Sequence, residues 1–186
     1  MEIKIYTVDV SELKNEKIFQ SLYRSVSIER RAKVDRMKFG KDKRLSLGAG
    51  ALLENVLAIE GVTDLEMMMV GNKKPCLAHY SNIKFNISHS GTKVMCTVSD
   101  CDIGCDVEKI TDIDMDIAKQ FFFAEEYAAL MNCQDKNSRN DLFFRYWTLK
   151  ESFMKATGLG FELALDEFCI IIKDTEILVR QSVNNL

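Results

Sequence analysis

The sequence lacks the features that would place the chain in a membrane or secreted class. Its 186 residues include a single proline, and no apolar run reaches the roughly 18–20 residues that span a bilayer. The first residues, Met1 to Val10, alternate apolar and polar side chains as a strand does, and they do not resemble a signal peptide. We therefore expect a cytoplasmic protein with no membrane partner.

The sequence also lacks closely spaced cysteine pairs and a large excess of positive or negative charge. The six cysteines form no Cys-x-x-Cys pair and no zinc-binding pattern with histidine, so we expect reduced thiols that serve as small core side chains. The formal net charge of −3 gives no strong overall field for nucleic acid. A hydrophobic content of 47% is typical of a globular protein, and the length allows one large domain or two small ones.

The strongest local signal is the stretch from Leu142 to Gly160, which reads as one helix. Glu151 and Lys155 are four residues apart, so they lie on one face of this helix, and Gly158 and Gly160 supply its stop. Alone, such a pair is typical of a surface ion pair; the alternative is a place in an active site. The apolar stripe of the helix contains Leu142, Tyr146, Leu149 and Phe153.

A second signal is a polar interruption between two strand patterns. Ile83–Ile87 and Val94–Val98 alternate as strands do, and Ser88-His89-Ser90-Gly91 breaks the pattern. A lone histidine is more often structural than functional. His89 nevertheless lies between two hydroxyls at a predicted strand end, where a side chain can face a ligand.

The third signal is the acidic pair in Asp102–Ile110. Alternation predicts a strand there, with Asp106 and Glu108 on one face about 6–7 Å apart. Two such carboxylates repel each other unless a cation lies between them, and Mg²⁺ prefers oxygen ligands. The alternative is an exposed strand edge with two solvated acids.

Basic residues concentrate in two helical patterns, Ser27–Phe39 and Lys41–Ile59. They either form a solvated face or converge on one phosphate. The basic side chains are Arg30, Arg31, Lys33, Arg36, Lys38, Lys43 and Arg44. Further along, Gly71–Pro75 predicts a turn in which Lys74 takes an extended conformation before Pro75.

The remaining patterns complete two halves of similar order. A first strand begins near Ile3, Asp116–Asn132 predicts a helix, and Cys133–Asn140 predicts a loop. Two short strands follow, Phe168–Ile172 and Ile177–Val179. We place a domain boundary near Ser99–Cys101, which gives domains of residues 1–100 and 101–186.

Three stretches taken together resemble the 4′-phosphopantetheinyl transferase superfamily, in the type that activates peptide synthetases and carrier proteins. They are Phe85–Gly91, Gly104–Glu108 and Trp147–Gly158. Weaker matches are Arg44–Gly48, Lys74-Pro75, and Phe121-Phe122 ahead of Glu126. The resemblance covers roughly residues 28 to 170.

The resemblance implies an α/β (α+β) fold of two similar halves with pseudo-twofold symmetry, each a small antiparallel sheet packed with helices. The cofactor is expected in the cleft between them. The implied reaction moves the 4′-phosphopantetheine arm of coenzyme A to a serine of an apo acyl or peptidyl carrier protein, releasing adenosine 3′,5′-bisphosphate. We expect a monomer that binds no nucleic acid. Because Leu186 comes earlier than the usual end of such chains, we expect an incomplete second sheet or support from a partner.

The resemblance also implies a role for each matching residue. The expected ligands of Mg²⁺, or of Mn²⁺, are Asp106, Glu108 and Glu151. Ser88 and His89 are expected at the phosphates of coenzyme A, and Arg30, Lys33 and Arg44 at its ribose 3′-phosphate. Lys74 and Pro75 are expected beside the adenine. Lys155, with Lys150 nearby, is expected at the diphosphate. Cleavage of a diphosphate needs charge neutralisation, and the serine nucleophile needs a base. Glu151 is the first candidate base and Glu126 the second.

Two other functions remain as alternatives. A binding module could hold coenzyme A or a carrier protein without turnover, but a pure binder does not need the full set of Asp106, Glu108, Glu151 and Lys155. Nucleic-acid binding through the basic residues is disfavoured by the negative net charge and by the lack of interleaved aromatic residues.

Overall fold

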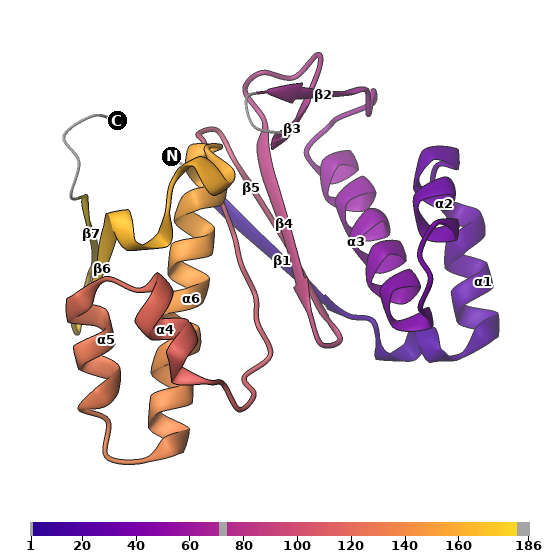
Figure 1. The fold of residues 1–186 in the computed structure, drawn as a ribbon. Coiled ribbons are helices and arrows are strands. Elements are labelled where there is room, and N and C mark those ends of the chain that lie inside the picture. The colour runs from indigo at the N-terminus through magenta and orange to yellow at the C-terminus, as the bar shows by residue number, and fades with distance from the viewer. Residues whose placement is uncertain (1, 71–73, 182–186) are drawn as a thin grey trace.

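The computed structural model describes residues 2–70 and 74–181, and its centre is a three-stranded antiparallel sheet (Figure 1). The strands are β1 (Ile3–Asp9), β4 (Lys84–Ser90) and β5 (Lys93–Ser99). β5 lies between the other two, so one edge of β4 has no strand partner among the described residues. In Figure 1 the sheet runs between two groups of helices, one from each end of the chain.

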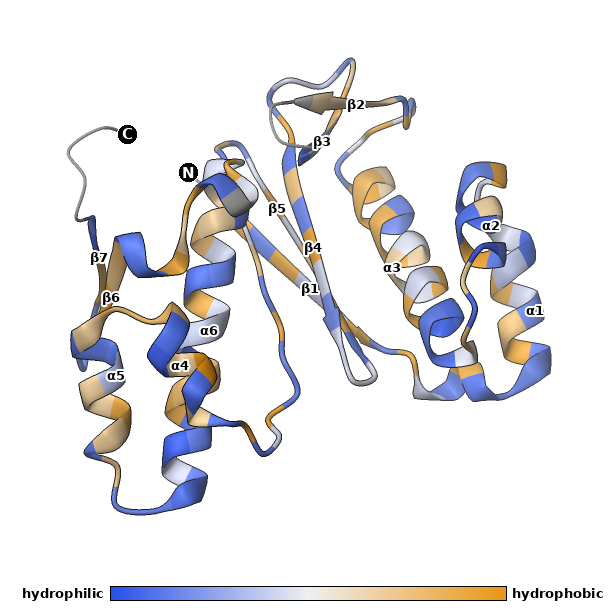
Figure 2. Cartoon of the chain, viewed as in Figure 1, coloured by the Kyte–Doolittle hydropathy of each residue, from blue (hydrophilic) through white to orange (hydrophobic). Residues whose placement is uncertain are grey.

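The N-terminal helices begin at capped positions and share a core with the sheet. They are α1 (Glu16–Ser25), α2 (Ile28–Asp35) and α3 (Gly40–Ile59), preceded by a 3-10 turn, η1 (Ser11–Lys14). Side chains of Asn15 and Ser27 accept backbone N–H groups of the first turns of α1 and α2. The first turns of α3 are hydrophilic (Figure 2), whereas further along Leu47 and Leu57 are fully buried, in two clusters that also contain residues of β5.

A small hairpin lies at one end of the sheet (Figure 1). It pairs β2 (Met67–Val70) with β3 (Lys74–Leu77) in antiparallel register. Of the predicted turn, residues 71–73 lie outside the described residues. Lys74 and Pro75 open β3, in the extended conformation that the residue before a proline favours.

The C-terminal elements form a separate apolar cluster. They are α4 (Met115–Phe121), α5 (Ala124–Met131), α6 (Lys136–Thr157), 3-10 turns η2 (Gly160–Glu162) and η3 (Leu165–Glu167), and strands β6 (Phe168–Ile172) and β7 (Ile177–Gln181). The ring of Phe143 stacks on Phe122 and on Trp147, with centroids 5.0 and 5.7 Å apart. This aromatic stack joins α6 to the break between α4 and α5.

The central helix of the sequence signal is present, but it begins earlier than predicted. Asp135 accepts the backbone N–H of Ser138 at 2.9 Å and caps α6, so the predicted loop over Cys133–Asn140 is wrong from Lys136 onward. The stop is as expected, because Gly158 adopts φ 72°, a left-handed conformation that favours glycine.

Three other local predictions are corrected. The helix expected over Asp116–Asn132 is interrupted at Phe122 and Phe123, where Phe122 turns into the core. The polar stretch from Ser88 to Ser90 belongs to β4, and the turn comes after it. Asp102–Ile110 forms no regular strand, because its N–H groups meet side chains of β4 and not backbone carbonyls.

The mixed α+β class is confirmed: small antiparallel sheets pack against helices in both parts of the chain. The described sheets differ in size, with three strands in the central sheet and two in the C-terminal one. The division near residue 100 stays a prediction. Among the described residues, no helix is long and apolar enough to cross a membrane.

Candidate active site

A cavity of about 800 Å³ lies between the two parts of the chain. Its walls come from α2, α3, β4, the 102–110 segment and α6. Most of the predicted site residues line it: Arg30, Lys33, Pro75, Ser88, His89, Asp106, Glu108, Glu151 and Lys155. Trp147, the single tryptophan, lines it as well. The cavity lining does not include Arg44, Lys74, Glu126 or Lys150.

A glycine allows the acidic segment to approach α6. A Cβ atom on Gly104 would collide with the backbone carbonyl of Ser152 and, at 2.5 Å, with the backbone nitrogen of Ala156. Backbone atoms of a helix cannot move aside as a flexible side chain can. The absence of a side chain at Gly104 therefore brings Asp106 and Glu108 beside Glu151 of the same helix.

Asp106 is the most enclosed carboxylate of the cavity. Its side chain is 3% exposed, and its Oδ1 accepts hydrogen bonds from Lys155 Nζ at 2.6 Å and Ser88 Oγ at 2.7 Å. Its Oδ2 is buried without a hydrogen-bond partner among the described residues. A buried anionic oxygen without a partner is costly, and a cation ligated at this oxygen would remove that cost.

The charges around Asp106 also favour an additional cation. The Lys155 ammonium lies 4.0 Å from Glu151 Oε2 and is the only cation in contact with these carboxylates among the described residues. Burial raises the pKa of Glu151, and the neighbouring Asp106 and Glu108 raise it further, while Lys155 opposes them. Three carboxylates facing one ammonium leave an excess of negative charge, which fits a divalent ion.

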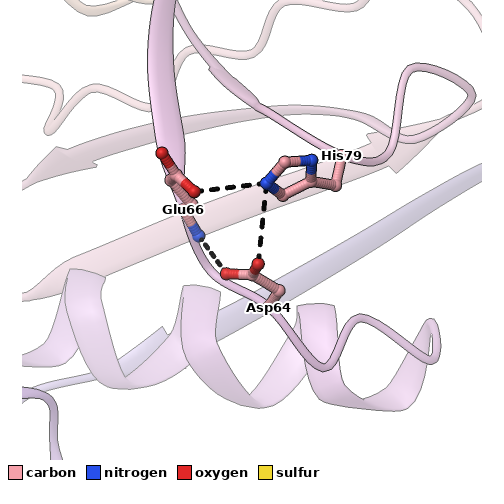
Figure 3. A group of neighbouring side chains, drawn as sticks. All are labelled: Asp64, Glu66 and His79. Carbon is pink, nitrogen blue, oxygen red and sulfur yellow. Dashed lines mark hydrogen bonds and ion pairs between the residues drawn. The ribbon is translucent and has the colours of Figure 1, made fainter.

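The three predicted ligands do not form a compact cluster in this structure. Among the described residues, the group whose ligand atoms all lie within 4.8 Å of one another is Asp64, Glu66 and His79, shown in Figure 3. All three are exposed, and their contacts explain their closeness: Glu66 N–H donates to Asp64 at 2.9 Å, and His79 Nε2 lies 3.2 Å from Glu66. This group lies outside the large cavity.

The predicted phosphate cluster is only partly assembled. Arg30 lies across α3, where a Cβ on Gly50 would overlap its side chain. Among the residues that the structure describes, the Arg30 guanidinium makes no hydrogen bond or ion pair. Burial lowers the pKa of both Arg30 and Lys33, and the neighbouring Arg30 lowers that of Lys33 further. Arg44 instead lines a neighbouring cavity that shares Glu108 with the first.

Lys74 connects the hairpin to the acidic segment and to α6. Its Nζ donates to the carbonyls of Ile103 at 3.2 Å and Ala156 at 3.0 Å. The Ala156 carbonyl belongs to the last turn of α6, where a cation is favourable. Pro75 lines the cavity beside it. The place of Lys74 beside adenine stays a prediction, and its ammonium joins the hairpin to the acidic segment and to α6.

Glu126 and Lys150, both predicted as site residues, lie in the C-terminal core and not in the lining of the large cavity. They form an ion pair of 2.9 Å in the C-terminal core, with side chains 1% and 0% exposed. Lys150 Nζ also donates to the carbonyls of Leu165 and Phe168, at 2.7 and 2.6 Å. Glu126 accepts the backbone N–H groups of two further residues, Phe123 and Ile170. In this arrangement each side chain has its polar atoms engaged within the core.

Comparison with known proteins identifies the family. The model of the 4′-phosphopantetheinyl transferase superfamily matches residues 102–182. The chain is 33% identical to 4′-phosphopantetheinyl transferase psf-1 of Bacillus pumilus over 89% of this chain and 73% of that protein. It is 32% identical to 4′-phosphopantetheinyl transferase Sfp of Bacillus subtilis (strain 168), over 90% of this chain and 76% of that one. It is 29% identical to HetI of Nostoc sp. (strain PCC 7120), over 94% and 76%.

The chain therefore belongs to the 4′-phosphopantetheinyl transferase superfamily, as the three sequence stretches predicted. Its enzyme class is that of a transferase that moves a phosphopantetheine group to a carrier protein.

Sequence reasoning missed several residues that build the site. Gly50 and Gly104 were not assigned roles, since only the folded chain shows what their missing side chains make room for. Asn86 and Ser90 hold the acidic segment, and Trp147 lines the cavity. The alternation of polar residues in Asn86-Ile87-Ser88-His89-Ser90 was the one available signal, because it places three polar side chains on one face of a strand.

Proposed function

We propose that the cavity holds coenzyme A with a divalent cation, Mg²⁺ or Mn²⁺. The 4′-phosphopantetheine arm passes from coenzyme A to a serine of the carrier protein. The observation that carries the proposal is the Oδ2 of Asp106, which is buried and has no hydrogen-bond partner among the described residues. It lies in a cavity shared with Glu108, Glu151 and Lys155. Coenzyme A brings a diphosphate, whose charge needs cations on both sides of the scissile bond.

The bond changes define what each residue must do. The serine oxygen forms a bond to the phosphorus next to the pantetheine arm, and the bond from that phosphorus to the bridging oxygen breaks. Adenosine 3′,5′-bisphosphate leaves with the bridging oxygen and its negative charge. A cation bound by the carboxylates supplies charge neutralisation at the diphosphate. Lys155, beside the carboxylates on the same helix as Glu151, donates hydrogen bonds to the diphosphate, and His89 of β4 donates to a phosphate oxygen.

The serine proton needs an acceptor within the cavity. Glu151 remains the candidate base, because it lines the cavity beside Lys155 and Asp106. Glu126, the second candidate base from the sequence, is enclosed in the C-terminal core, so the proposal keeps Glu151 alone.

The 3′-phosphate is assigned to Arg30 and Lys33. Both line the large cavity, and Arg30 has no anionic hydrogen-bond partner among the described residues. The separate cavity at Arg44 contains Lys41, Ser90 and Lys109 and adjoins the first through Glu108. Arg44 is therefore not part of the 3′-phosphate site in this proposal.

Four further properties belong to the proposal. The protein acts in the cytoplasm, as a monomer, without nucleic acid, and on an apo acyl or peptidyl carrier. The six cysteines are free thiols in the structure, in keeping with a reducing compartment.

Mass spectrometry of an apo carrier protein incubated with the chain, coenzyme A and Mg²⁺ tests the function. A gain of one phosphopantetheine arm, absent without enzyme and absent with a carrier whose acceptor serine is alanine, supports transfer. Binding of coenzyme A without any mass gain on several acyl and peptidyl carriers would overturn turnover and favour a binding module.

A further inference from the structure

The acidic segment runs alongside β4 and is joined to it by side chains. Backbone N–H groups of Cys105, Val107 and Lys109 donate to side-chain oxygens, at 3.0, 3.3 and 3.1 Å. The acceptors are Asn86 Oδ1, Ser88 Oγ and Ser90 Oγ, in that order along β4. Both chains advance by two residues per contact, so the segment follows β4 in parallel without any strand pairing.

Each serine in this row makes a second contact, with the carboxylate that precedes its backbone donor. Ser88 Oγ donates to Asp106 at 2.7 Å, and Ser90 Oγ donates to Glu108 Oε2 at 2.6 Å. A hydroxyl has one proton to donate, so each serine is committed to its carboxylate while it accepts from the next N–H. One clamp is thus repeated twice, once for each acidic residue.

The clamp fixes one oxygen of each carboxylate. Short O–H···O⁻ bonds such as these are charge-assisted and hold the acceptor in one orientation. Partners of this kind determine how well a first ligand meets a cation, and their loss typically costs about 10- to 100-fold in metal affinity.

We infer that Ser90 is a positioning residue for cation binding, since it orients Glu108 as Ser88 orients Asp106. The inference rests on the metal site of the proposed function. Ser90 gives the clean test of the pair, because Ser88 Oγ also lies 3.5 Å from Lys155 Nζ. Among the described residues, the hydroxyl of Ser90 bonds only to Glu108 and Lys109.

Titration of the full chain with Mn²⁺ alone, followed by electron paramagnetic resonance of the free ion, measures the effect without turnover. Ser90→Ala should weaken Mn²⁺ binding about ten-fold, and Ser90→Thr, which keeps the hydroxyl, should stay within about two-fold of wild type. Thr92→Ala is the matched control, because this nearby hydroxyl donates to Asp9 at 3.1 Å and not to the acidic segment. It should leave Mn²⁺ binding unchanged.

The carrier assay adds a second readout. If Ser90 only positions the ligand, raising Mn²⁺ should restore the turnover of Ser90→Ala toward wild type, whereas a catalytic group would not be replaced in this way. Should the alanine variant fail to fold by circular dichroism, Ser90→Cys keeps the volume with a weaker donor and is expected to show a smaller loss of the same sign.

Mn²⁺ binding by two variants separates the role of Ser90 from the metal site itself. Equal Mn²⁺ affinity in Ser90→Ala and wild type, with a clear loss in Glu108→Gln, overturns the role of Ser90 and leaves the metal site standing. Unchanged affinity in both variants removes Glu108 from the site, and with it the inference.

Discussion

Lys155 Nζ lies 2.6 Å from Asp106 Oδ1, so the lysine proposed to hold the diphosphate is here the counter-ion of a proposed metal ligand. The same ammonium lies 4.0 Å from Glu151. The Lys155 ammonium therefore competes with a metal cation for the negative charge of Asp106 and Glu151. Arrival of the cation would free Lys155 for phosphate.

Replacement of Lys155 by methionine should separate metal binding from catalysis. Lys155→Met keeps the length of the side chain and removes the competing charge, so Mn²⁺ should bind about ten-fold more tightly in the absence of coenzyme A, a difference of about 1.4 kcal/mol. Turnover should nevertheless fall at least a hundred-fold, because the diphosphate loses a cation. Weaker Mn²⁺ binding in this variant would contradict the competition.

A second prediction concerns stability and pH at Glu151. Burial raises the pKa of the Glu151 carboxyl in the folded state above its value in the unfolded state. At a pH below the unfolded-state pKa the carboxyl is protonated in both states, so it does not reduce the free energy of unfolding. As the pH rises, the unfolded state ionises first and stability falls, until the pH passes the folded pKa and the cost becomes constant. Glu151→Gln lacks this cost.

Thermal melting with a chelator present measures this difference. Glu151→Gln should melt at a higher temperature than wild type at pH 8, and the two should converge as the pH falls toward 4. With Mg²⁺ added, only wild type should gain stability. A variant that melts below wild type at pH 8 would show that Glu151 is not a strained carboxylate.

A third prediction tests the revised phosphate site. Arg30→Ala should reduce the preference for coenzyme A over 3′-dephospho-coenzyme A, measured as the ratio of the two kcat/KM values, by roughly ten- to a hundred-fold, since a charge-assisted bond contributes about 1.5–3 kcal/mol. Arg44→Ala is the matched control and should preserve the preference, because Arg44 lines the other cavity. The reverse pattern would move the 3′-phosphate to Arg44.

The buried pair of Lys150 and Glu126 gives a fourth prediction, one of stability. Glu126→Gln leaves an uncompensated ammonium in the core and should lower the free energy of unfolding by about 3–5 kcal/mol in urea. The double variant Glu126→Gln, Lys150→Met should recover part of this loss, since neither charge remains. A large loss of turnover in Glu126→Gln without any loss of stability would restore a catalytic role for Glu126.

The sequence predicted the chemistry of the cavity better than the path of the chain around it. Glu151 and Lys155 were placed on one helical face, and they do line the cavity together with Asp106. The strand expected at Asp106 was wrong, because period-two alternation is the same in a paired strand and in an extended segment held by side chains. Whether the segment pairs as a strand or is held by side chains depends on the groups that β4 offers it, and these are set by the tertiary structure.

Lys150 and Lys74 show a different limit. Lys150 adjoins Glu151 in the sequence, yet successive helix residues point in different directions, and the Lys150 side chain enters the core. Lys74 reaches carbonyls that lie 29 and 82 residues away. Contacts between residues so far apart in the sequence leave no local pattern. The cofactor contacts expected of Lys74 and Lys150 therefore rested only on the resemblance to the family.

The last prediction concerns Gly104, whose missing side chain permits the contact between the acidic segment and α6. Gly104→Ala adds one methyl group against the backbone at Ser152 and Ala156, so either the segment or the helix must move. Because α6 is fixed by its aromatic core, the segment should move and carry Asp106 away from Lys155 and Glu151. Mn²⁺ affinity should then fall at least ten-fold.

The control for this change is Gly61→Ala, at a glycine with no atom within 4 Å of its Cβ position. Gly61 has φ 81°, so alanine there is strained and should lower stability without touching the cavity. Comparing Mn²⁺ affinity between the two variants therefore separates a general loss of stability from a displaced ligand. If Gly104→Ala loses stability but binds Mn²⁺ as tightly as Gly61→Ala does, Asp106 has kept its place, and the close approach at Gly104 does not position the metal ligands.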